Sequence, residues 1–166
     1  MDLKTMIYIQ SETEFSRARS KGFWDVKRSL MTGHKPFLLP FQEVVKGLPA
    51  TPTINSGLQD IPLKNIVGSV GRARDFTRHF MPRVRDEQSK ERWRIIYTLA
   101  VSGAGFPPVE VFQIGPVYFV QNGHHRVSVA SYLGWPTLQA NVTVWPSTPI
   151  GATDLIAQPQ RRIGVN

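Results

Sequence analysis

Residues 105–134 read GFPPVEVFQIGPVYFVQNGHHRVSVASYLG, and this stretch decides the expected fold. Residues 109–114 alternate and are rich in β-branched side chains, a pattern that predicts a strand. Gly115 and the proline after it predict a turn, and residues 117–121 predict the strand that returns from it. The stretch therefore begins with a β-hairpin.

A helix is predicted after the hairpin, over residues 124–133. Gly134 suits the left-handed position that follows many helices, and Pro136 prevents the helix from continuing. Residues 138–145 alternate again and predict a last strand. Together with the hairpin, these elements predict an α/β (α+β) fold, with a small mixed sheet and flanking helices.

Less regular elements are predicted before this stretch. Residues 86–102 place apolar side chains on one helical face and predict a helix. Residues 61–67 predict a strand or the lead-in to one. Nearer the N-terminus, residues 6–9 predict a short strand, and a capping box that begins at Ser11 predicts a helix over residues 12–31.

These elements divide the chain into three regions. Residues 58–146 form the predicted domain, residues 1–50 form a helical N-terminal extension, and residues 147–166 show little periodicity and predict a C-terminal tail. The extension has enough apolar surface either to pack on the domain or to form a homodimer. The residues that supply this surface are Trp24, Phe37, Phe41 and Leu48.

Charge narrows the class of partner. The 166 residues include 20 Lys and Arg against 12 Asp and Glu, which gives a formal net charge of +8. The basic segment 72–94 favours polyanions. The alternative is a solvated helix face of mixed charge, because acids stand among these bases at helical spacing. We expect nucleic-acid contacts from four arginines: Arg72, Arg74, Arg78 and Arg83.

Composition excludes several chemistries. The chain has no cysteine, which excludes disulfides, thiolate zinc sites, iron–sulfur clusters and cysteine nucleophiles. Its apolar runs are too short to span a bilayer, and its first residues do not resemble a signal peptide. We therefore expect a cytoplasmic protein without a membrane partner.

The segment Asn122-Gly123-His124-His125-Arg126 carries the clearest chemical signal. Free N–H groups and the macrodipole at a helix start favour an anion. Gly123 lets the backbone approach a ligand closely, and Arg126 can donate paired hydrogen bonds to phosphate oxygens. The alternative is that Asn122 only caps the helix and the two histidines are surface residues.

No metal site is expected at the paired histidines. Adjacent helical side chains diverge by about 100°, so both imidazoles rarely reach one ion. After residue 94 the chain has only two acidic residues, Glu110 and Asp154, and a two-metal site needs clustered carboxylates.

The order and spacing of these motifs resemble the ParB/sulfiredoxin superfamily over about residues 61–145. The match runs through GFPPVEVF at 105–112, YFV at 118–120 and GHHRVSVA at 123–130. The resemblance implies a small α/β fold around a nucleotide-phosphate pocket.

Matched residue by residue, Gly123 and Arg126 agree with the boxes of both ParB and sulfiredoxin. His125 agrees with the sulfiredoxin histidine. His124 replaces the sulfiredoxin cysteine, which excludes sulfinic-acid repair by that mechanism.

The resemblance leaves three functional hypotheses in order of preference. The first is a nucleotide-phosphate-binding ParB-like protein that acts on or near DNA and binds CTP or ATP, with Mg²⁺ accompanying the nucleotide. The second is an NTP- or ADP-dependent small-molecule kinase resembling the free-serine kinase branch, and the third is a nuclease. The phosphate-binding residues would be Gly123, His124, His125, Arg126 and Arg72.

An enzyme of this kind would perform phosphoryl transfer or phosphodiester hydrolysis. Its candidate catalytic residues are His124, His125 and Asp75, since a histidine or an aspartate can move protons. The alternative for Asp75 is a helix cap or an ion-pair partner of the neighbouring arginines.

Overall fold

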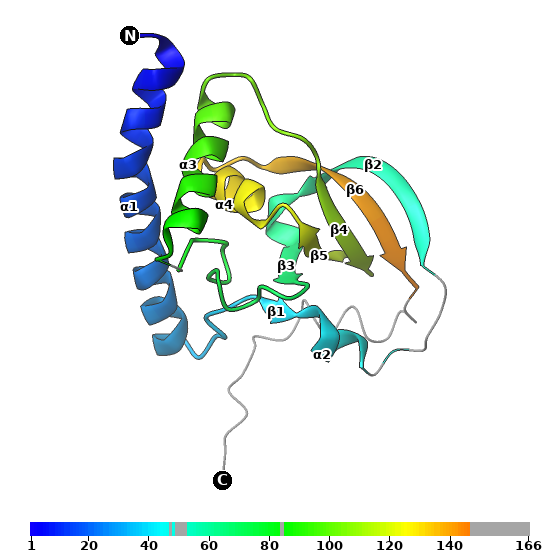
Figure 1. Cartoon of the computed structure of the whole chain (residues 1–166). Coiled ribbons are helices and arrows are strands. Elements are labelled where there is room, and N and C mark those ends of the chain that lie inside the picture. The colour runs from blue at the N-terminus through cyan, green and yellow to red at the C-terminus, as the bar shows by residue number, and fades with distance from the viewer. Residues whose placement is uncertain (47, 49–52, 84, 147–166) are drawn as a thin grey trace.

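The computed structural model describes residues 1–46, 48, 53–83 and 85–146, and Figure 1 shows their arrangement. A six-stranded sheet has the order β1-β3-β5-β4-β6-β2. The strands are β1 (Leu39–Pro40), β2 (Ile54–Pro62), β3 (Ile66–Ser69), β4 (Val109–Ile114), β5 (Val117–Asn122) and β6 (Thr137–Trp145). The helices are α1 (Leu3–Met31), α2 (Phe41–Val45), α3 (Glu87–Val101) and α4 (His124–Tyr132).

The sheet is mixed, as predicted. The pairs β1–β3, β3–β5 and β4–β6 are parallel, and β4–β5 and β2–β6 are antiparallel. The predicted hairpin is β4–β5, closed where Ile114 pairs with Val117. The α/β class, with a small mixed sheet and flanking helices, is confirmed.

The helices α1, α3 and α4 form successive layers on one side of the sheet, with α4 between α3 and the strands (Figure 1). Val127 and Ala130 of α4 pack with the sheet. Val129, on another side of the same helix, packs with Trp93 of α3 and Phe15 of α1. Because both sides of α4 are covered, its first turn is held in a fixed place.

Alternation along the strands gives the sheet a second apolar face. Phe119 and Ile114 point to it and pack with Phe41 of α2. Val120, next to Phe119, and Val111, three residues before Ile114, point to the α4 side, as the two-residue period of a strand requires.

The N-terminal prediction was wrong. Residues 6–9 belong to α1, which begins at Leu3 and is capped by Asp2, whose carboxylate accepts from the Thr5 N–H at 2.8 Å. Ser11 is not a cap: it is buried within the helix and accepts a hydrogen bond from Arg94. Apolar residues of α1 pack against α3, and this packing stabilises the helix through residues 6–9. The predicted end at Met31 is confirmed.

Residues 61–67 do not form one strand. They comprise the end of β2, a 3₁₀ turn over Leu63–Asn65 and the start of β3. The predicted tail, residues 147–166, lies outside the described residues. Within the part of the chain that the structure describes, no helix is both long and apolar enough to cross a membrane.

Candidate functional site

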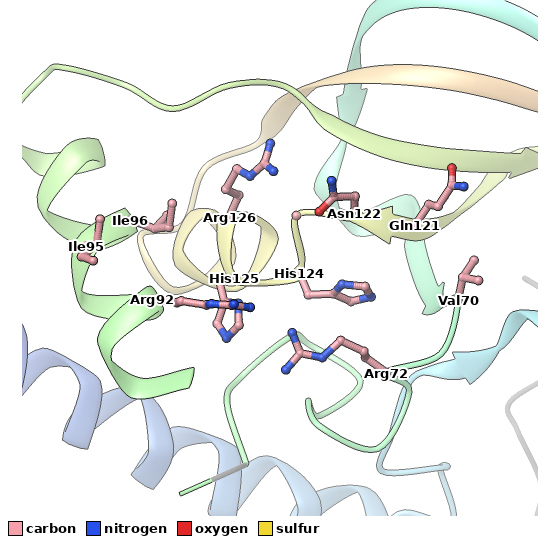
Figure 2. A pocket seen from close by; sticks show the side chains of 11 residues that line it. Val70, Arg72, Arg92, Ile95, Ile96, Gln121, Asn122, His124, His125 and Arg126 are labelled. Carbon is pink, nitrogen blue, oxygen red and sulfur yellow. The ribbon is translucent and has the colours of Figure 1, made fainter. Parts of the chain in front are cut away.

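A cavity of about 390 Å³ lies at the start of α4. Its walls come from the loop after β3, from α3, from the end of β5 and from the first turn of α4. Arg72 and Arg92 reach it from different elements, and Figure 2 shows both guanidinium groups on the same side of α4 as the two histidines. No carboxylate is among the described residues that line it.

Gly123 makes the helix start possible. It is the N-cap residue, with φ of 102°, and no side chain caps the helix. A Cβ at this position would lie 2.7 Å from Val109 Cγ1. The first N–H groups of α4 therefore have neither an intrahelical partner nor a side-chain cap, and the alternative in which Asn122 caps the helix is wrong.

His124 is buried, with 5% of its surface exposed. Its Nε2 lies 2.6 Å from Ser69 Oγ, and the backbone N–H of Arg72 donates to the same oxygen at 3.0 Å. The ring stacks on Phe76 with 6.0 Å between centroids. Burial, and then the charge of Arg72, lowers the pKa of His124 to about 4. The side chain is thus neutral at pH 7 and ties α4 to β3, and the surface alternative is wrong for His124.

His125 is partly buried and points to the Arg72 and Arg92 side of the cavity. Burial, together with the charges of those two arginines, lowers its pKa to about 4. A neutral imidazole in this place can donate one N–H to an anion. Its pKa rises when a negative charge enters.

Arg72 and Asp75 form an ion pair. Arg72 Nε donates to Asp75 Oδ2 at 2.8 Å. Asp75 is thereby engaged as an ion-pair partner, which is the alternative considered for it from the sequence. The pair fixes the loop that brings Arg72 to the cavity.

Arg126 lines the cavity but its guanidinium turns away from Arg72 and Arg92 (Figure 2). Its Nη1 donates to the carbonyl oxygens of Pro107 at 3.0 Å and Pro108 at 2.6 Å. These bonds hold the start of α4 against the segment that leads into β4.

The arginines predicted to contact nucleic acid have different surroundings. Arg72 points into the cavity, whereas Arg83 stacks on Phe37 at 4.0 Å and donates to the carbonyl of Arg74. Arg74 is exposed, and Arg78 is partly buried. The structure therefore brings only Arg72 to the predicted phosphate site.

Two residues of this site were missed by the sequence analysis, Arg92 and Ser69. Arg92 carried a signal, because its helical neighbours at i±3 and i±4 are apolar or uncharged and leave it without a carboxylate partner on α3. Ser69 carried none, since its partner His124 lies 55 residues away. Among the described residues, no group of three or more His, Asp and Glu side chains could hold a metal ion.

No protein-family model matches the chain, and no curated protein does. Among solved structures, the chain is similar to sulfiredoxin from Arabidopsis thaliana. The two share 18% sequence identity with a TM-score of 0.37, and the match covers 61% of this chain and 98% of that chain.

Proposed function

We propose that the cavity at the start of α4 binds the phosphate groups of a nucleotide. The observation that carries this proposal is the meeting of Arg72, Arg92 and an uncapped helix N-terminus in a cavity whose described lining has no carboxylate. Each of these groups favours a negative charge. A phosphate there would also accept a hydrogen bond from neutral His125.

The size and the lining of the cavity suit more than a bare ion. Its volume of about 390 Å³ falls in the range of small-molecule sites, roughly 300–1,000 Å³. Ile95, Ile96 and Val70 supply apolar walls on which a sugar or a base can pack. The likeness of residues 123–126 to the ParB and sulfiredoxin boxes supports the same ligand class, as an analogy between families.

Action on or near nucleic acid stays a prediction. It is supported by the net charge of +8 and by the exposed Arg74 and Arg83. His124 is engaged by Ser69, and Asp75 by Arg72. No observation therefore favours the kinase or nuclease alternative over phosphate binding.

Thermal unfolding with ATP, CTP and pyrophosphate, each with and without Mg²⁺, tests the proposal. A ligand at a hundred times its Kd stabilises by about 2.7 kcal/mol, which raises the Tm of a chain this size by about 5–10 °C. Arg92→Gln should remove most of that rise, because it removes one of the two guanidinium groups at the cavity. The packing should stay intact, because Arg92 is exposed on α3.

Arg85→Gln is the matched control, since Arg85 is also exposed and is not among the residues that line the cavity. It should keep the full rise in Tm. The proposal fails if no phosphate compound raises the Tm of the parent protein, or if Arg92→Gln and Arg85→Gln lower the rise equally.

A further inference from the structure

A second and larger hollow, of about 1310 Å³, lies along α1 beside the end of α4. We call it the α1 groove. Its apolar lining includes Trp24 and Met31 of α1, Met81 and Tyr132. Trp24 is 64% exposed and Met31 is 87% exposed. Apolar side chains that gather at an open hollow, rather than standing singly, mark an interaction surface.

The charged residues that line the α1 groove are basic, with the exception of Asp25. Lys21, Lys27 and Arg28 line it, and none of them forms an ion pair within the described residues. Asp25 also lines the groove, but its carboxylate already contacts His79 at 2.7 Å. The groove thus presents unpaired positive charge beside apolar surface.

The lysines lie over the aromatic rings of this region. Lys21 Nζ is 4.9 Å from the centroid of Tyr132, and Lys27 Nζ is 5.2 Å from that of Trp24. A nucleic-acid base would compete with these ammonium groups for the ring faces over which they lie. Carboxylates, in contrast, pair with the ammonium groups where they are, while apolar side chains contact the ring edges and the adaptable methionines.

We propose that the α1 groove binds an acidic amphipathic segment of a partner protein. Charge complementarity selects this occupant: its carboxylates meet Lys21, Lys27 and Arg28, and its apolar face meets Trp24 and the methionines. An amphipathic helix laid in an apolar groove presents such anchors at i, i+3 or i+4, and i+7. A second copy of this chain is a poor occupant, because two copies that each carry a net charge of +8 repel each other.

Selection of peptides on the full chain tests this proposal. The probe is a displayed library of random peptides of about 14 residues, or about four helical turns. Enriched clones should be net negative, with apolar residues at helical spacing. Their affinity, measured by fluorescence anisotropy, should fall about tenfold or more with Trp24→Ala and should also fall with Lys27→Glu.

Ile9→Ala and Lys4→Glu are the matched controls, because both residues are exposed on the same helix and outside the groove lining. They should leave the affinity within about twofold. The proposal is overturned if no clone is enriched, if enriched clones are not acidic, or if Trp24→Ala has no effect. It is also overturned if a thymidine oligonucleotide competes for Trp24, or if Trp24→Ala abolishes a dimer of the free chain.

Discussion

The two ends of α4 border two basic hollows that differ in what surrounds their positively charged side chains. At the start of the helix, Arg72 and Arg92 face a small cavity together with an uncapped helix N-terminus and a neutral histidine. Beside the end of the helix, the lysines of the α1 groove lie over aromatic rings, and the floor is apolar.

The difference shows that net charge alone does not identify a partner. Donors that converge at one place suit the compact charge of a phosphate group. Cations that lie over aromatic rings beside methionine side chains suit a ligand that is acidic and apolar at once. The same excess of positive charge thus supports two ligand classes, and changes confined to one hollow separate them.

The largest expected effect comes from adding one methyl group at Gly123, and the comparison is the same change at Gly22, which is not among the residues that line the α1 groove. Gly123→Ala should destabilise the protein by about 4 kcal/mol, because it combines backbone strain with overpacking: φ is +102° and the new Cβ meets Val109 at 2.7 Å. Gly22→Ala, on α1, meets its nearest neighbour at 3.1 Å and gains helix propensity of about 1 kcal/mol. We expect its stability to stay within about 1 kcal/mol of the parent in urea unfolding. Equal losses for the two variants would contradict this contrast.

The next effect is a pH dependence of the free energy of unfolding that comes from the buried histidine of the cavity. The folded-state pKa of His124 is lowered to about 4 from its ordinary value of 6.5, so the unfolded chain takes up the proton first as the pH falls. The contribution of neutral His124 to the stability is therefore fully present above about pH 6.5, and about 3 kcal/mol of it is lost as the pH approaches 4.

NMR titration of the imidazole resonances measures the folded-state pKa values on which this prediction depends. Both His124 and His125 should remain neutral at about pH 5 in the free protein. Saturating pyrophosphate should raise the pKa of His125, because the anion favours the charged ring. A protonated His124 at about pH 5 in the folded free protein would refute the burial argument.

Arg126→Ala should have an intermediate effect. The variant loses the two hydrogen bonds to the carbonyl oxygens of Pro107 and Pro108. The cost is about 1–2 kcal/mol at the typical value of such bonds. Urea unfolding without ligand measures it. An unchanged free protein that has lost phosphate binding would instead assign Arg126 to the ligand, as the sequence analysis expected.

The smallest effect is expected in the α1 groove. Trp24→Ala should change the free energy of unfolding by less than about 0.5 kcal/mol, as for most surface changes, because the indole is 64% exposed. Urea unfolding of this variant beside Ile9→Ala makes the comparison. A loss of more than about 2 kcal/mol would show that Trp24 stabilises the fold and would remove it as a binding anchor.

The sequence alone determined the elements whose signals are local. Residues 109–134 encode the hairpin and α4 through strand alternation and turn residues, and both were confirmed. The short apolar run 6–9 has no such local signal. It was predicted as a strand and is helical because Ile7 and Phe15 pack against Trp93, a residue far along the chain.

Only the tertiary structure decided the composition of the two hollows. The cavity needs Ser69 beside His124, Arg72 beside His125, and Arg92 delivered from α3. The α1 groove needs Trp24 and Tyr132, which are distant in the sequence, to line the same hollow. The physical reason is that helix periods, caps and turns depend on neighbours within about four residues. The direction of an arginine and the pKa of a histidine depend instead on groups that are brought close only when the layers pack.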